Sequence, residues 1–340
     1  MAKIAIALGG VLLLILAFTG YTYYQLYFKP NVSDKDHYLF IKTGSSFEDV
    51  MKSVAENKIL KNELSFRTAA EEMNYGTKIK PGRYKFSKGS SNRQLINMLK
   101  AGNQEPVDFF FRSIRLKTDF AGRVSMLLEA DSASLVHLLD SEAFVKKYGF
   151  NKETVYTMFL PNSYEMYWNT SAEEFFERMN KEYKKFWNED RLAKAKQVGL
   201  SPVQVSVLAS IVDAEALHDD EMPTIAGLYL NRYKKGIRLQ ADPTVIYATG
   251  DFSIRRVLNK HLRISSPYNT YLNAGLPPGP IMMPSINAID AVLNYKKHDY
   301  IYMCAKDDFS GYHNFAVTEA QHLVNARKFQ QALNVRNIKR

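Results

Sequence analysis

The chain has 340 residues, 46% hydrophobic and 24% charged, a balance typical of a globular protein that excludes a largely disordered chain. Its length allows two or three folding units, and 45 Lys and Arg against 35 Asp and Glu give a net charge of +10, which suits nucleic acid, acidic lipid headgroups or an anionic polymer. The one cysteine, Cys304, excludes a disulfide within the chain and is expected to be buried.

The first predicted element is a membrane-spanning helix. Residues 4–18 are an uninterrupted apolar and small-residue run, and the stretch to Tyr24 holds about 20 residues, enough to cross a bilayer core. A cleaved signal peptide is the alternative, because residues 17–20 could serve as a cleavage site. The tyrosines that follow suit a membrane interface and favour a retained anchor at residues 4–24.

This anchor predicts where the rest of the chain acts. We expect residues 1–3 to be the cytoplasmic end of a single-pass protein of the cytoplasmic (inner) membrane, with its body on the extracytoplasmic side. The flanking charges support this orientation only weakly, because Lys3 on one side of the span is balanced by Lys29 on the other. A body held outside the cytoplasm rarely meets nucleic acid, so we expect no nucleic-acid partner. The positive charge then indicates an anionic envelope polymer or the lipid surface.

Residues 36–105 are predicted to form a small α+β module from two similar strand–turn–helix units. Extended segments at residues 38–41 and 84–86 each lead into a Gly-Ser turn. In each unit a serine, Ser46 or Ser91, then caps a helix whose apolar residues recur at spacings of three and four.

The rest of the chain is predicted to be a connector and a larger domain. The connector, residues 106–155, has a buried strand at 109–111 and two helical patterns. Residues 156–340 are predicted to be a mixed α+β domain with several helices, a strand at 300–305 and a final helix at 318–333. Its many Gly and Pro turns between residues 236 and 284 predict loops that line a site. The fold class is therefore α+β.

A helix at residues 201–215 carries the candidate acid. It opens with a serine, a proline and a glutamine in the pattern of a capping box. At about 100° per residue, Glu215 falls beside Leu208 and Ile211, while Asp213 falls on the opposite shoulder. A carboxyl held against hydrocarbon resists ionisation, so its pKa rises and it can donate a proton near neutral pH. A solvated or salt-bridged carboxylate is the alternative.

Four sequence blocks accompany this glutamate in a specific order. They read ASIVDAE at residues 209–215, LQADPTVIY at 239–247, SPYNTY at 266–271 and GLPPGPI at 275–281. In this order they resemble the endolytic murein lytic transglycosylases of the YceG-like (MltG) family, and the resemblance covers nearly the whole chain. It implies a transmembrane helix at residues 4–24, a LysM-like module at 36–105 and a YceG-like catalytic domain at 156–340, with Glu215 as the catalytic glutamate on a helix.

The resemblance also implies substrate-binding residues in the loop blocks, whose hydrogen bonds and rings would orient the sugar and its peptide. These residues are Gln240, Asp242, Thr244, Tyr268, Asn269, Thr270 and Tyr271. For each of them, loop packing is the alternative, and Asp242 ahead of a proline could simply stabilise a turn.

The chain departs from the family pattern at a few positions. Tyr156 stands where the family usually begins a block with an acid, so no acid acts there. Ala316 and Gln321 replace a serine and a glutamate, which puts a catalytic role for these two positions in doubt. His313 and His322 follow the pattern, but the sequence assigns them no role.

Cleavage of a glycosidic bond usually takes two carboxylates, and Asp242 is the one candidate partner for Glu215. The acetamido group of the sugar can replace the second carboxylate. We therefore expect neutral Glu215 to protonate the oxygen of the β-1,4 bond between N-acetylmuramic acid and N-acetylglucosamine. As a carboxylate it would then accept the C6 hydroxyl proton, which closes a 1,6-anhydro ring and ends the strand. A hydrolytic muramidase and a non-catalytic wall-binding scaffold are the alternatives.

No cofactor and no metal are expected, because the seven histidines lack clustered Cys or acidic neighbours at ligand spacing. The segment HDDE at residues 218–221 indicates a solvated loop rather than a ligand set. The resemblance implies peptidoglycan glycan strands as substrate, the lipid bilayer as support and penicillin-binding synthases as further partners.

Overall fold

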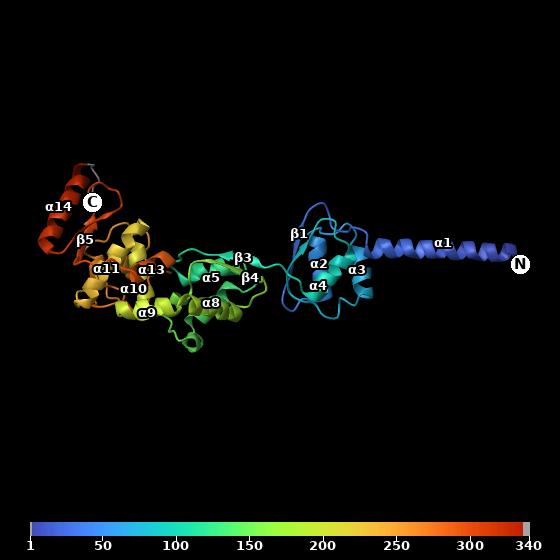
Figure 1. The fold of residues 1–340 in the computed structure, drawn as a ribbon, viewed down its shortest axis with the longest axis horizontal. Helices are drawn as coiled ribbons and strands as arrows, with labels where there is room; N and C mark the ends of the chain where they lie inside the picture. Colours follow the sequence, from blue (N-terminus) through green and yellow to red (C-terminus); the bar gives the residue numbers. More distant parts are fainter. Residues whose placement is uncertain (1, 336–340) are drawn as a thin grey trace. The chain divides into compact units, whose positions relative to one another are not determined.

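The computed structural model describes residues 2–335 of the chain (Figure 1). Met1 of the predicted cytoplasmic end and residues 336–340 of the predicted catalytic domain lie outside the described residues. The described residues form two compact units: residues 2–109, 126–130 and 164–171 make unit 1, and residues 110–125, 131–163 and 172–335 make unit 2. Helices and short two-stranded sheets build both, which confirms the mixed α+β class.

Unit 1 begins with the apolar helix α1 (Ala2–Tyr27). Its most apolar stretch has a mean hydropathy of 2.3 and is not buried within the protein, so by length and composition α1 can cross a membrane. Within the described residues, α9 (Glu189–Val198) and α10 (Pro202–Glu215) meet the same criterion as a pair bent by 74°. Eight consecutive residues of α10 are buried inside unit 2, so its apolar character reflects a protein core.

The module that follows α1 pairs two strands and packs helices against them (Figure 1). Strands β1 (His37–Ile41) and β2 (Gly82–Phe86) are antiparallel, with His37 opposite Phe86. The helices are α2 (Phe47–Glu56), α3 (Glu63–Glu72) and α4 (Asn92–Ala101). Ser46 and Ser91 each cap a helix in a capping box, as the sequence predicts. Alternate residues of β2 are buried against these helices, which places the core between them.

Strands β3 (Val107–Phe110) and β4 (Ser163–Met166) pair in a second sheet, and most of their residues belong to unit 1. The remaining elements are mostly helices of unit 2. The helices are α5 (Lys117–Ser125), α6 (Ser132–Asp140), α7 (Glu142–Val145), α8 (Ala172–Phe186), α9, α10, α11 (Met222–Lys234), α12 (Asp242–Thr249), α13 (Ile286–Leu293) and α14 (Glu319–Val335). Short 3-10 turns are η1 (Lys146–Tyr148), η2 (Val155–Met158), η3 (Asp219–Glu221) and η4 (His261–Arg263).

A third sheet closes unit 2. Strands β5 (Tyr302–Ala305) and β6 (His313–Ala316) form an antiparallel hairpin in which Ala305 lies opposite His313. One core cluster of the unit is built mainly by α10, α11 and α13, whose apolar side chains pack together. One local prediction is wrong: residues 242–249 form α12, whereas the sequence indicated turns, because Asp242 and Pro243 begin a helix that Gly250 ends.

Candidate functional site

Glu215 is the last residue of α10, a helix that lies in the core of unit 2. The Ser201 hydroxyl accepts from the Gln204 backbone N–H, and the Gln204 side chain accepts from the Ser201 N–H at 2.9 Å, so the capping box forms as predicted. Residues 205–212 of α10 are all buried. Because these turns are locked in the core, the position of Glu215 is fixed by packing.

Among the described residues, the Glu215 carboxyl has one hydrogen-bond partner. The Tyr229 hydroxyl, from α11, donates a hydrogen bond of 2.8 Å to Glu215 Oε1. Burial raises the pKa of Glu215 to about 7, with a further rise from the nearby Asp242 charge, while the Tyr229 bond acts in the opposite direction. Burial also raises the pKa of Tyr229 far above its usual value, so this phenol remains a donor at physiological pH. Near pH 7 Glu215 can therefore both give and take a proton.

Glu215 opens into a cleft of about 520 Å³ within unit 2. Its walls come from α10, α11, the segment before α12, the β5–β6 hairpin and α14. The lining residues are Glu215, Leu228, Tyr229, Arg232, Leu239, Gln240, Asp242, Tyr271, Ile301, Tyr302, Met303, Cys304, Ala305, His313, Glu319, His322 and Leu323. The cleft thus combines an acid of raised pKa with hydroxyl, amide, guanidinium and imidazole groups, which suits a polar ligand rich in hydroxyls.

Arg232 holds one wall of this cleft together. Its side chain is 5% exposed and donates hydrogen bonds to the backbone carbonyls of Arg238, at 2.8 Å, and Ile301, at 2.6 Å. It also donates to the Gln240 side chain. Gln240 adopts a left-handed backbone conformation (φ 54°). The Arg232 guanidinium therefore holds Gln240 in this left-handed conformation, with its side-chain amide at the cleft.

Asp242 and Tyr271 form a second pair in the cleft. The Tyr271 hydroxyl donates a hydrogen bond of 2.6 Å to Asp242 Oδ1. Desolvation raises the pKa of Asp242 although its side chain reaches solvent, while the Tyr271 bond acts to lower it. Four predicted site residues, Glu215, Gln240, Asp242 and Tyr271, therefore line one cleft.

Three other predicted site residues lie beneath this surface. Thr244, Asn269 and Thr270 are each at most 1% exposed, and none of them lines the cleft. The hydroxyls of Thr244 and Thr270 lie 2.8 Å apart, and the Thr270 hydroxyl accepts from the Ala241 N–H at 3.0 Å. The Asn269 amide donates to two backbone carbonyls and its oxygen accepts from the Tyr271 N–H. These groups hold the two cleft segments in register.

Tyr268 lies apart from the residues that line the cleft. Its ring packs against Tyr247, with centroids 4.7 Å apart. A Cβ on Gly279 would lie 3.1 Å from the Tyr268 hydroxyl and 2.1 Å from the Glu153 carbonyl oxygen, so only glycine fits there. The structure therefore places Tyr268 in a tightly packed neighbourhood.

Asp213, two residues before Glu215, faces another helix. It accepts hydrogen bonds from the Ser285 N–H at 2.7 Å and the Ser285 hydroxyl at 3.1 Å. Ser285 is the N-cap of α13, so Asp213 connects α10 to the start of that helix. Desolvation raises the pKa of Asp213 against the effect of these bonds. Its position explains a structural role for this carboxyl.

The segment after α10 contains a buried carboxylate that the sequence did not indicate. Glu221 is 6% exposed and accepts from the His313 backbone N–H at 2.8 Å, while its other oxygen lies 2.7 Å from His313 Nδ1. His218 stacks on Tyr312 with centroids 4.1 Å apart, and the Tyr312 hydroxyl donates to Asp220. The prediction of a solvated loop at residues 218–221 is therefore wrong for Glu221, because its buried carboxylate joins the start of α11 to the β5–β6 hairpin.

The hairpin and α14 complete the opposite wall. The rings of Tyr302 and His322 stack with centroids 5.3 Å apart, and the Arg232 guanidinium lies 5.9 Å from the Tyr302 ring centre. The prediction of a buried Cys304 is wrong, because its strand borders the cleft and leaves the thiol half-buried. Within residues 2–335, no group of three or more His, Cys, Asp or Glu side chains is arranged to hold a metal ion.

The comparisons with known proteins agree on one family. Residues 39–328 match the model of the YceG-like family. An endolytic murein transglycosylase of Bacillus subtilis is 28% identical over 79% of this chain and 78% of its own length. One of Streptococcus pneumoniae is 25% identical over 78% of this chain, which spans about half (53%) of that relative.

A solved structure supports the same fold. The crystal structure of a YceG-like protein from Listeria monocytogenes superimposes with a TM-score of 0.57 at 25% sequence identity. The similarity covers 86% of this chain and 99% of the Listeria chain. The two chains therefore share their architecture over most of their length.

Proposed function

Because this chain belongs to the YceG-like family, we propose that it is a lytic transglycosylase that cleaves the glycan strands of peptidoglycan, with Glu215 as the group that moves the proton. Relatives from two genera are named endolytic murein transglycosylases, which supports this reaction class. One observation carries the role of Glu215: a carboxyl at the end of a buried helix has a pKa of about 7 and opens into a polar cleft.

The reaction needs two proton transfers, and one carboxyl makes both of them. Neutral Glu215 gives its proton to the oxygen between N-acetylmuramic acid and N-acetylglucosamine as the bond from that oxygen to C1 breaks. The C6 hydroxyl oxygen then bonds to C1, and the Glu215 carboxylate takes the hydroxyl proton. The products are a free 4-hydroxyl and a 1,6-anhydro end, and no water is consumed. Tyr229 orients the carboxyl and stabilises its charged state.

The predicted binding residues divide between two roles in this proposal. Gln240, Asp242 and Tyr271 line the cleft and would contact the sugar and its substituents. Thr244, Asn269 and Thr270 would act through them by holding their segments in place. Tyr268 would support the same loops through its packing on Tyr247. Contact with substrate is therefore proposed for the first three residues and positioning for the others.

We place this reaction at the outer face of the cytoplasmic membrane. Helix α1 would be a single-pass anchor and the following module a LysM-like domain that contacts glycan. Cleavage within strands close to the membrane would end the elongation of nascent glycan. Penicillin-binding synthases, which make such strands, would be partners in the same process.

Hydrolysis is the second candidate, and Asp242 favours it. Two carboxyls in one cleft are the usual equipment of glycoside hydrolases, and Asp242 lies close enough for its charge to raise the pKa of Glu215. In that reaction a water molecule replaces the C6 hydroxyl, and the product has a reducing end. A wall-binding scaffold would need no acid of raised pKa.

Mass spectrometry of the products distinguishes these candidates. The full chain in detergent is incubated with purified glycan strands, beside Glu215→Gln and the matched control Asp213→Asn. We expect anhydro ends, one water lighter than reducing ends, from the wild type and the control, and no new ends from Glu215→Gln. Reducing ends would establish the muramidase instead, and unchanged cleavage by Glu215→Gln would exclude Glu215 as the proton carrier.

A further inference from the structure

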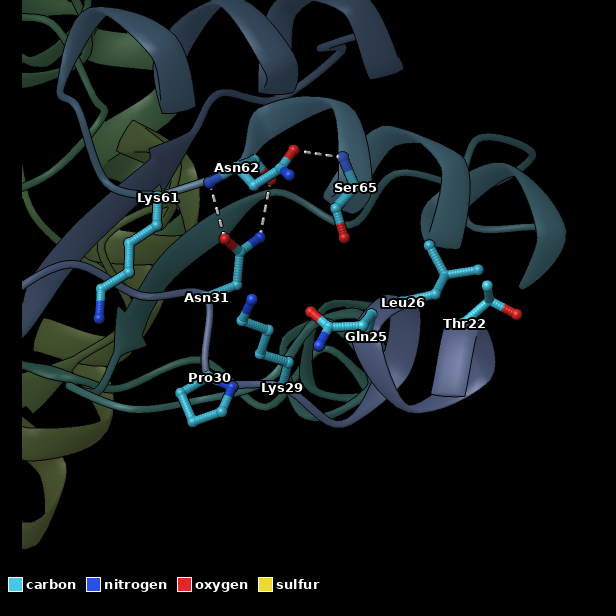
Figure 2. A pocket seen from close by; sticks show the side chains of 9 residues that line it. All are labelled: Thr22, Gln25, Leu26, Lys29, Pro30, Asn31, Lys61, Asn62 and Ser65. Carbon is cyan, nitrogen blue, oxygen red and sulfur yellow. Dashed lines mark hydrogen bonds between the residues drawn. The ribbon is translucent and has the colours of Figure 1, made fainter. Parts of the chain in front are cut away.

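A second cavity of about 540 Å³ lies in unit 1, where α1 meets the module (Figure 2). It is lined by Thr22, Gln25, Leu26, Lys29, Pro30, Asn31, Lys61, Asn62 and Ser65. Six of these residues belong to α1 or closely follow it, and three belong to the start of α3 or directly precede it. The cavity is therefore formed by the anchor and the module together.

The junction that forms this cavity is fixed. The Asn92 side chain donates a hydrogen bond of 2.8 Å to the Leu26 carbonyl, and the Tyr27 hydroxyl lies 2.5 Å from a Glu72 oxygen. Immediately after α1, Pro30 forms a β-bridge with Ser91. The anchor therefore continues into the module through defined contacts, and the cavity keeps its walls.

The amides of the cavity wall are already engaged with each other. The Asn31 side chain donates to the Asn62 carbonyl and accepts from the Asn62 N–H, both at 2.8 Å, and Asn62 caps α3 by accepting from the Ser65 N–H (Figure 2). These bonds shape the wall and leave the cations free. Within the described residues, the ammonium groups of Lys29 and Lys61 make no hydrogen bond or ion pair, and no carboxylate lines the cavity. An anionic group is the ligand that this arrangement lacks.

The length of α1 determines where the cavity lies relative to the bilayer. A helix of 26 residues at 1.5 Å per residue measures about 39 Å, whereas the hydrocarbon core of a bilayer is about 30 Å thick. If the span begins near Ile4, about 20 residues bring it to Tyr23. Lys29 and the cavity then lie in the headgroup layer, where lipid phosphates are found.

We propose that this cavity binds the headgroup of an anionic glycerophospholipid, with the lipid phosphate between Lys29 and Lys61. The proposal rests on the membrane anchorage proposed above. The Gln25 amide, which has no hydrogen bond to the described residues, would serve the hydroxyls of a glycerol headgroup. Such a lipid would fix the height of the module above the bilayer.

The test measures lipid retention by the full chain in detergent. Native mass spectrometry follows the binding of phosphatidylglycerol, with phosphatidylcholine as the neutral comparison and inorganic phosphate as a competitor. The variant Lys29→Gln/Lys61→Gln removes both cations from the cavity. The matched control Lys42→Gln/Lys52→Gln removes two lysines from another cavity of unit 1, of about 480 Å³, which Asp49 and Glu56 also line.

We expect one tightly held phosphatidylglycerol and weaker retention of phosphatidylcholine. Each removed lysine should weaken retention about five-fold, the effect of one cation at an anionic membrane surface, and the control should change it less than two-fold. Equal weakening in both double variants would show general attraction and overturn the proposal, as would equal retention of the two lipids. Displacement by inorganic phosphate at equal concentration would assign the cavity to free phosphate.

The outcomes for two variants distinguish a failure of the lipid-binding proposal from a failure of the proposed function. The Lys29→Gln/Lys61→Gln variant should cleave glycan strands in detergent at the wild-type rate, because both lysines belong to unit 1 and the cleft to unit 2. Glu215→Gln should lose cleavage and retain the lipid. Loss of cleavage without loss of lipid retention in the lysine variant would contradict the assignment of this cavity.

Discussion

The two sides of the last turn of α10 carry carboxyls two residues apart, yet their surroundings differ completely. Asp213 accepts two hydrogen bonds from the residue that caps α13. Glu215 accepts a hydrogen bond from Tyr229 and opens into the cleft. Burial raises the pKa of both. A raised pKa therefore does not identify an acid catalyst by itself, and access to a ligand decides between structure and function.

The largest expected effect is on turnover and separates these two sides directly. Glu215→Gln keeps the shape of the side chain and removes the proton, so we expect the rate of glycan cleavage to fall about 10²- to 10⁴-fold. Asp213→Asn makes the same chemical change on the structural side, and we expect less than a three-fold loss. Initial rates from the release of soluble fragments measure both. Similar losses of rate in the two variants would contradict the assignment of a catalytic role to Glu215 and a structural role to Asp213.

The cleft also depends on Glu221, which connects the start of α11 to the β5–β6 hairpin. Glu221→Ala leaves the His313 N–H and ring without their buried acceptor, so we expect a loss of about 2–4 kcal/mol in the free energy of unfolding. Asp220→Ala, which removes the more exposed bond from Tyr312, should cost less than about 1 kcal/mol. Chemical denaturation measures both. Equal costs would contradict a special role for the Glu221 contact.

Sequence periodicity predicts the position of Glu215 on its helix better than it predicts which residues contact Glu215. The capping box and the 3.6-residue repeat place Glu215 against apolar neighbours, because both are local properties of one helix. Tyr229 could not be identified as its partner, since the crossing of α10 and α11 is set by side-chain packing. The block at residues 239–247 contains the cleft residues Gln240 and Asp242, but no sequence pattern predicts that Gln240 faces the cleft while Thr244 is buried.

The partner of Glu221 is even less accessible to sequence reasoning. His313 lies 92 residues further along the chain, and only the fold brings the two together. The density of acids at residues 218–221 indicated solvent, because charged side chains are rarely buried. The glycine at position 311 is the one sequence feature that relates to this contact. In the structure Gly311 adopts a left-handed conformation (φ 84°), and a Cβ there would lie 2.4 Å from a Leu217 side-chain atom. A glycine at that point is consistent with close approach of two segments.

A third prediction uses stability to compare the two sides. Glu215 has a pKa of about 7 in the folded protein and about 4.5 in the unfolded chain, so the folded state holds its proton more tightly. Its contribution to stability is complete below pH 4.5 and is lost as pH rises to 7. Glu215→Gln does not titrate and should therefore be more stable than wild type by about 1–3 kcal/mol at pH 8, a figure reduced for access of the side chain to the cleft.

Denaturation at several pH values measures this difference. The advantage of Glu215→Gln should grow between pH 4.5 and 7 and stay constant above. Asp213→Ala provides the contrast, because it leaves the Ser285 N–H without an acceptor and should lower the stability by about 1–2 kcal/mol. A Glu215→Gln protein no more stable than wild type at pH 8 would show that the wild-type carboxylate is well solvated, which would remove the basis for its role as an acid.

The smallest expected effect concerns Tyr229, the one hydrogen-bond donor to Glu215 in the described part of the chain. Its bond lowers the pKa of Glu215, so Tyr229→Phe should raise that pKa by about one unit. Turnover requires the protonated acid in its first step, so the alkaline limb of the pH–rate profile should move from about pH 7 towards pH 8. The maximal rate should fall about ten-fold, because the carboxyl loses its orienting partner.

Asp242→Asn should move the alkaline limb of the pH–rate profile to lower pH, since the Asp242 charge raises the pKa of Glu215. Limbs that stay in place in both variants would mean that another group is titrated in the reaction.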